Sequence, residues 1–186
     1  MSVKASLLKR MALTLVAGVA LALPSVAKAD LLGGLSLRVG GFFPVHSDLR
    51  DVTDVAVWGG GIDYKIPWFP RLLNGEAWST SISADFYYSE RIPGVYRYFP
   101  ASINQVYTFE ERNGIAPYAG FSAVVATFGT SGTAPKQPMV TRFGAGLILG
   151  LNFGKNLYWE NRYEWIDGHD AMFVPEGFRT SIGYRF

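Results

Sequence analysis

Cysteine is absent from the 186-residue sequence, and histidine occurs only twice, at His46 and His169. Without cysteine, an exported chain cannot use disulfide bonds and must gain its stability from a soluble core, a metal or a lipid solvent. The two histidines, with Asp48 and Asp170 beside them, offer ligand types without the spacing that is typical of a metal site. We therefore expect no metal ion and no cofactor.

Long apolar runs are also scarce, since only residues 11–23 approach the length of a membrane helix. Basic residues precede this run, and the AKA sequence at 27–29 places small residues where a signal peptidase reads them. We predict a cleaved signal peptide over residues 1–29 and a mature domain over residues 30–186. An uncleaved anchor is the alternative, but the run is short for one. Because no comparable run follows, a mature chain that spans a membrane must do so as a β-barrel.

The chain has no large net charge of either sign once the signal peptide is removed. The whole sequence has 17 basic and 15 acidic residues. The four basic residues of the signal peptide leave the mature chain with 13 basic and 15 acidic groups, a formal charge of −2. No basic surface then favours nucleic acid as a partner.

The mature sequence does contain a series of segments in which apolar and polar residues alternate. Their lengths of about 10 residues suit tilted membrane strands, and no segment with a helical period interrupts them. The predicted fold is all-β, an eight-stranded antiparallel up-and-down transmembrane β-barrel. Its predicted strands are Leu35–Val45, Val55–Ile66, Trp78–Tyr88, Tyr98–Phe109, Ile115–Phe128, Thr141–Phe153, Leu157–Ile166 and Phe178–Phe186.

The connections alternate between long polar loops and short turns, as expected for a barrel with both termini in the periplasm. One connection breaks this rhythm, because residues 67–77 (PWFPRLLNGEA) are long where a short turn is expected. Its apolar side chains are expected to rest on the inner interface of the bilayer, and a plug or lid under the barrel is the alternative. These side chains are Trp68, Phe69, Leu72 and Leu73.

Ionised residues occur on most strands, on the face opposite the apolar side chains. In a lipocalin-like soluble barrel the apolar face lines a cavity, whereas in an outer-membrane barrel it meets lipid and the charges pair inside. Aromatic residues near the strand ends and glycines on the charged face favour the second arrangement. We predict a lumen plugged by charged side chains and interpret it as structural, with a gated ion path as the alternative. The predicted members are Arg38, Asp63, Lys65, Asp85, Arg142, Glu160, Arg162, Glu164, Arg179 and Arg185.

The last strand, FRTSIGYRF, alternates up to a terminal phenylalanine. Its final aromatic residues are expected to lie at the inner lipid interface. The strand also looks like the signal that barrel-assembly machinery recognises by pairing with a free strand edge. The predicted assembly signal consists of Phe178, Ile182, Tyr184 and Phe186.

The stretches RFGAGLILGLNF, LYWENRYEW and GFRTSIGYRF resemble small eight-stranded outer-membrane barrels, namely the OmpA transmembrane domain, OmpX and the opacity-type proteins. The resemblance covers most of residues 31–186 and implies fold and location more than activity. The penultimate strand is also similar to that of the PagL-like lipid A deacylases. Residues 162–167, however, contain neither the histidine nor the serine of the His-x-Ser pair in those enzymes, so their activity is not expected here.

The predicted outer loops contain the residue types of a hydrolase, which needs a nucleophile, a base and an orienting acid. His46 could meet Ser47 or Ser89 there, with Asp48 or Asp170 as the acid. Adjacent residues of an extended segment point apart, which disfavours the first of these pairs. We therefore expect ordinary solvated loop residues.

The expected protein is a non-enzymatic, monomeric outer-membrane barrel with a structural or surface-interaction role. Its expected partners are outer-membrane lipid, lipopolysaccharide and the barrel-assembly machinery, without nucleic acid. A small-solute channel and a lipid A-modifying enzyme are the two alternatives.

Overall fold

The computed structural model describes residues 33–66, 77–91, 94–132 and 136–186. Residues Gly34–Arg185 form one compact unit. The predicted signal peptide and most of the long connection 67–77, with all four of its apolar side chains, lie outside the described residues.

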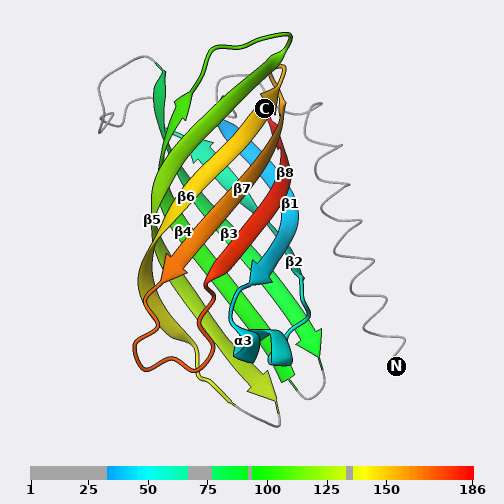
Figure 1. The fold of residues 1–186 in the computed structure, drawn as a ribbon, viewed down its shortest axis with the longest axis vertical. Helices are drawn as coiled ribbons and strands as arrows, with labels where there is room; N and C mark the ends of the chain where they lie inside the picture. The colour runs from blue at the N-terminus through cyan, green and yellow to red at the C-terminus, as the bar shows by residue number, and fades with distance from the viewer. Residues whose placement is uncertain (1–32, 67–76, 92–93, 133–135) are drawn as a thin grey trace. The chain divides into compact units, whose positions relative to one another are not determined.

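Eight strands close into one barrel in which each strand pairs antiparallel with the next and β8 pairs with β1 (Figure 1). The predicted fold class is confirmed. The strands are β1 Leu35–Pro44, β2 Val57–Lys65, β3 Trp78–Arg91, β4 Gly94–Thr108, β5 Ile115–Gly132, β6 Val140–Phe153, β7 Leu157–Ile166 and β8 Gly177–Arg185.

The predicted strand bounds are correct for β7 and too short for β3, β4 and β5. The ladder between β3 and β4 continues as far as Arg91 and Gly94, through residues whose polarity predicted a loop. The strand β5 likewise extends to Gly132. Strands can continue beyond a bilayer because backbone pairing does not require apolar side chains. A change to polar residues in the sequence therefore indicates where the membrane boundary lies, and it does not indicate where the strand ends.

A helix occurs where none was predicted, since residues Ser47–Val52 after β1 form the six-residue helix α3. Asp48 lies in its first turn and Arg50 in its last, as the helix dipole favours. Of its two apolar residues, Leu49 is fully buried and Val52 packs partly buried against the same cluster. We call the end of the barrel at α3 the outer end, at the bottom of Figure 1, and the opposite end the inner end. Across the described ranges, no helix has the length and apolar character needed to cross a membrane.

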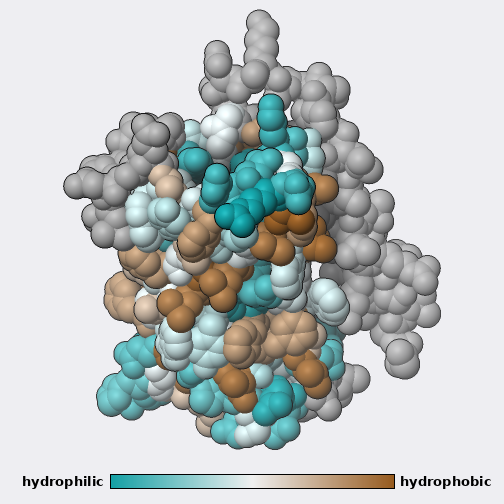
Figure 2. Space-filling model, turned by 45° about the horizontal axis from the view of Figure 1, so that its top comes forward, coloured by the Kyte–Doolittle hydropathy of each residue, from teal (hydrophilic) through white to brown (hydrophobic). Residues whose placement is uncertain are grey.

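The outward face of the barrel is apolar and the inward face is polar or aromatic. Leu147, Leu149 and Trp159 are exposed on the outside, whereas Glu160 and Arg162 are buried within. Figure 2 shows apolar side chains across the middle of the visible face, with polar side chains toward both ends. The outer-membrane type of orientation is therefore present, and the lipocalin-like alternative is excluded.

Candidate functional site

The lumen contains two zones that follow one another along the barrel axis. The first, which we call the charge network, occupies the middle. The second, which we call the outer aromatic core, fills the outer end beneath α3. The charge network consists of Arg38, Asp63, Asp85, Glu160, Arg162, Glu164 and Arg179. The outer aromatic core consists of Phe42, Leu49, Val57, Tyr87, Tyr96, Tyr98, Val124, Ala126, Phe128, Ile166 and Phe173.

Arg38 is the centre of the charge network. Its Nε and Nη2 donate to the two carboxylate oxygens of Asp85, each at 2.7 Å. Its Nη1 donates to Glu160 Oε1 at 3.3 Å, so one guanidinium joins β1 to β3 and to β7. A bidentate arginine–carboxylate pair is among the stronger and more directional hydrogen-bonded arrangements. The pair between Arg38 and Asp85 therefore fixes the distance between β1 and β3 across the lumen.

Arg179 connects the network to the aromatic core. Its Nη1 donates to Asp85 Oδ2 at 2.6 Å, and its Nη2 donates to Glu164 Oε1. The other oxygen of Glu164 accepts the Tyr98 hydroxyl at 2.6 Å. The Arg179 guanidinium also lies 5.9 Å from the centre of the Tyr87 ring. Tyr98 therefore belongs to both zones, with its ring in one and its hydroxyl in the other.

Arg162 binds the opposite side of the lumen. Its Nε donates to Glu160 Oε1 at 2.6 Å, and its Nη1 donates to Asn104 Oδ1 at 2.9 Å and to Ser102 Oγ at 3.2 Å. The second oxygen of Glu160 accepts the Tyr118 hydroxyl at 3.1 Å. Neutral polar groups thus accept from Nη1 of Arg162, which no carboxylate reaches.

The network holds one more carboxylate than guanidinium, and the excess lies at Asp63. Its Oδ2 is 3.9 Å from both Arg38 Nη1 and Arg162 Nη2, beyond hydrogen-bond distance. It accepts the Ser81 hydroxyl at 3.0 Å. The Asp63 side chain is also 17% exposed, against 0–7% for the other three carboxylates. The network is therefore closed toward the outer end and incompletely neutralised toward the inner end.

Glycines make the room that these side chains occupy. Gly61 lies in register between Arg38 and Asp85, and a Cβ there would overlap the carboxylate. Gly183 lies between Arg38 and Tyr158, and a Cβ there would overlap the tyrosine ring. The predicted role of glycine on the charged face, to leave space in a narrow lumen, agrees with these positions.

The outer aromatic core packs as the interior of a soluble protein does. The Phe42 ring centre is 5.0 Å from that of Tyr98 and 6.0 Å from that of Tyr87. Leu49 from α3 and Phe173 from the loop before β8 close the barrel at its outer end. Burial of a large apolar side chain contributes about 1.5–3 kcal/mol. Sequence reasoning missed this core, although its strand residues follow the same alternation as Arg38 and Asp85.

The outer loops are held over this core by polar contacts. The Phe173 amide donates to Gln137 Oε1 at 2.7 Å, and the Gln137 amide donates to Thr130 Oγ1 at 2.8 Å. Arg142 donates through Nε and Nη2 to the His169 carbonyl at 3.2 and 3.0 Å. Arg142 thus anchors a loop at the outer end.

Three residues of the predicted plug, Arg142, Arg185 and Lys65, lie outside the charge network as defined above, at other heights along the barrel. Arg142 contacts the outer loop because it stands near the outer end of β6. Arg185 stands at the inner end of β8, where its Nη1 donates to Asn152 Oδ1 at 3.3 Å. Lys65 is exposed at the inner end of β2. All three share the inward face with the network, but alternation gives no information on height along the barrel.

The loop residues considered for catalysis do not form the hydrolase arrangement that was weighed as an alternative. His46 Nε2 lies 3.1 Å from Glu176 Oε2, an acid that sequence reasoning did not consider. The Ser47 hydroxyl donates to Asp48 rather than to His46. The structure places Ser89 inside the barrel, where it is buried. Within the described ranges, no group of three or more metal-ligating side chains occurs.

The residues of the predicted assembly signal lie in or just after β8. Phe178 and Ile182 are exposed on the outer face. Tyr184 is paired with Leu37 of β1 and with Leu157 of β7, and Phe186 follows the end of the strand. In the closed barrel both edges of β8 are paired, so recognition by assembly machinery stays a prediction.

No protein-family model and no curated protein matches the sequence. Among solved structures, Neisserial surface protein A (NspA) is similar with a TM-score of 0.54 and 13% identity, over 81% of this chain and 92% of that one. The outer membrane enzyme PagL is similar with a TM-score of 0.50 and 17% identity, over 82% and 97%. The chain therefore has the fold of the small eight-stranded outer-membrane β-barrels.

Proposed function

We propose that the chain is an exported outer-membrane barrel with a structural or surface-interaction role and a lumen that does not conduct. The observation that carries this proposal is the double closure of the lumen, by the outer aromatic core and by the charge network. An eight-stranded barrel is only wide enough for its side chains to fill. The loops above the core are then the part of the molecule that is available to the outside.

The membrane location is supported by the exposed apolar belt. Exposed side chains such as Trp58, Phe143 and Leu149 form part of an outer surface that hydrocarbon would cover. Monomeric soluble proteins rarely expose contiguous apolar surface on this scale. In the proposed topology, the outer end with α3 faces the cell exterior and both termini face the periplasm.

Electrophoresis with and without boiling tests the membrane-barrel part of the proposal. A small membrane barrel stays folded in detergent until heated, so the unboiled sample should migrate differently from the boiled one. The intact mass of the mature protein should correspond to a chain that begins at Asp30. A protein that is recovered in the periplasmic extract instead of the membrane fraction would contradict the proposed location.

Planar-bilayer recording tests the closed lumen. The wild-type protein is expected to add no steady conductance, and Glu164→Gln is expected to leave this result unchanged because the aromatic core still closes the outer end. A steady conductance in the wild-type protein that changes on substitution of Arg162 or Glu164 would favour the small-solute channel.

A lipid A-modifying activity is the second candidate, and the contact between His46 and Glu176 favours it. A carboxylate that orients an imidazole is one part of a hydrolytic site. Tyr163 donates its hydroxyl to the other oxygen of Glu176 at 2.8 Å, which fixes the acid further. A mass shift of lipid A on expression, abolished in His46→Ala, would support this activity. An unchanged lipid A spectrum would remove it.

A further inference from the structure

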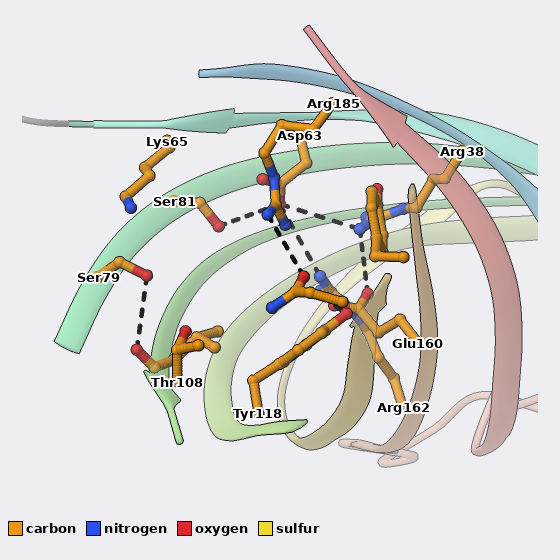
Figure 3. Close-up of a pocket in the computed structure, with 13 residues that line it drawn as sticks. Arg38, Asp63, Lys65, Ser79, Ser81, Thr108, Tyr118, Glu160, Arg162 and Arg185 are labelled. Atoms are coloured by element: carbon orange, nitrogen blue, oxygen red, sulfur yellow. Dashed lines mark hydrogen bonds and ion pairs between the residues drawn. The ribbon is translucent and has the colours of Figure 1, made fainter. Parts of the chain in front are cut away.

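An open pocket lies at the inner end of the barrel, on the inner side of the charge network (Figure 3). We call it the inner vestibule. Side chains from all eight strands line it, and its cavity volume is about 80 Å³, with a mouth that opens to solvent. Arg38, Glu160 and Arg162 form its floor, and Lys65 and Arg185 come from the inner ends of their strands. Because the network and the aromatic core close the other side, the vestibule is a blind pocket that opens only inward.

The vestibule contains an anionic group that the protein does not fully neutralise. Asp63 faces it with both neighbouring guanidinium nitrogens 3.9 Å away. Its hydrogen bonds come from neutral donors, Ser81 Oγ at 3.0 Å and Asn104 Nδ2 at 3.4 Å. A carboxylate in a partly desolvated site favours a cation beside it. A ligand ammonium at Asp63 would balance the charge of the network.

The vestibule also contains a cationic group with donors to spare. Arg185 uses Nη1 for one hydrogen bond to Asn152, and its guanidinium lies 5.2 Å from the centre of the Tyr158 ring. A guanidinium has five N–H donors and is suited to bidentate binding of a carboxylate or phosphate. The remaining donors of Arg185 are therefore suited to an anionic ligand group.

These two groups stand at the same height. Ser36 of β1 is in register with Asp63 of β2 on one side and with Arg185 of β8 on the other. Neighbouring strands are about 4.8 Å apart, so the two backbones are roughly 10 Å apart across β1. No ion pair within 4.0 Å joins these two described side chains. Asp63 and Arg185 therefore place opposite charges on the wall of the pocket on either side of β1, an arrangement suited to a ligand that carries both charges.

We propose that the inner vestibule binds a small zwitterion of the amino acid or short peptide class, with its ammonium group at Asp63 and its carboxylate at Arg185. Lys65, two residues along β2 from Asp63, also lines the pocket, and in Figure 3 its amine is turned away from Asp63. Hydroxyl and amide groups of Ser79, Ser81 and Asn152, which also line the pocket, provide partners for a peptide backbone. The site is independent of conduction, since the vestibule is blind.

Titration of the refolded barrel in detergent micelles tests this site, with backbone amide resonances as the readout. The probes are glycylglycine, ethylamine as the cation alone and acetate as the anion alone. Glycylglycine is expected to shift resonances of the vestibule in a saturable manner, with an apparent affinity at least about tenfold higher than that of either single-charge probe.

Two variants separate the two charges of the site. Asp63→Asn retains an acceptor for Ser81 and Asn104, and it should reduce glycylglycine affinity to that of acetate. Arg185→Gln should reduce it to that of ethylamine. The matched controls are Asp51→Asn in α3 and Arg97→Gln on the outside of β4, which should bind glycylglycine as the wild type does.

Retention of the wild-type amide spectrum in each variant shows that the barrel is folded. If Asp63→Asn does not refold, Arg185→Gln at the strand end still tests whether loss of one charge weakens binding. The proposal is overturned if glycylglycine produces no saturable shifts, as would occur if Arg185 closed directly onto Asp63. It is equally overturned if acetate or ethylamine binds as tightly as glycylglycine, or if neither Asp63→Asn nor Arg185→Gln weakens the binding of glycylglycine. None of these results depends on whether the lumen conducts.

Discussion

At the level of Phe42 and Tyr98 the lumen is filled by aromatic rings, whereas a few residues further in, at Arg38 and Asp85, it is filled by paired ions. The rings are stabilised by removal of apolar surface from water, which is non-directional and tolerant of rearrangement. The ions depend on geometry, because a buried pair must recover the cost of desolvation through well-placed hydrogen bonds. The comparison indicates that the core gives stability and a seal, and that the network gives a fixed arrangement.

Replacement of Arg38 should have the largest effect, because the charge network fails when one partner is removed. Arg38→Met leaves Asp85 and Glu160 without their shared cation, and loss of one partner of a buried ion pair costs about 3–5 kcal/mol. The free energy of unfolding, measured by urea titration in micelles with tryptophan fluorescence, should fall by this amount. The exposed Arg97→Met is the control and should change it by less than about 0.5 kcal/mol. A loss below about 1 kcal/mol in Arg38→Met would show that the network is dispensable.

Truncation of the cap over the aromatic core should have a smaller effect. Leu49→Ala removes a fully buried side chain of α3, at an expected cost of about 2–3 kcal/mol. Local unfolding of the first loop should absorb part of this cost, so protease cleavage within residues 45–56 should increase more than global stability falls. Val55→Ala, an exposed change in the same loop, should leave both quantities unchanged. Uniform loss of stability without new cleavage would contradict a separate cap.

Removal of the Tyr98 hydroxyl, which joins the two zones, should lower the free energy of unfolding by a smaller amount. Tyr98→Phe deletes the hydrogen bond to Glu164, which still receives Arg179, so the expected loss is about 1.5 kcal/mol. Tyr96→Phe is a matched control in the same core. The Tyr96 hydroxyl is buried without a hydrogen-bond partner in the described structure, and its removal should be neutral or stabilising. Equal losses in the two variants would mean that the rings, and not the link to Glu164, account for the effect.

The smallest effect is expected at the solvated rim. His46→Ala removes the contact with Glu176, where the histidine side chain is 53% exposed, and exposed ion pairs contribute about 0–1 kcal/mol. Added salt should reduce the difference between variant and wild type further. A loss that exceeds that of Tyr98→Phe would show that the loop contact, rather than the lumen, controls stability.

Much of the architecture could be predicted from alternation. Strand number, pairing order and the inward direction of Arg38, Asp85, Glu160 and Arg162 follow from a period of two residues and from the inability of a membrane to solvate free backbone groups. The helix α3 could not be predicted, because six residues with one buried leucine form no periodic pattern. The positions of Arg142 and Arg185 along the barrel axis, relative to the charge network, could not be predicted from alternation either.

The sequence alone determined which face of each strand meets hydrocarbon, since only one face of each carries enough apolar surface. The tertiary structure alone decided which ions meet. Arg38 reaches Asp85 and Glu160, 47 and 122 residues away, through the register that barrel closure imposes. The same register leaves Asp63 unbalanced beside the vestibule, places Glu176 beside His46 and gathers the rings at one end. Register depends on the tilt and stagger of all the strands together, and no single segment of sequence carries that information.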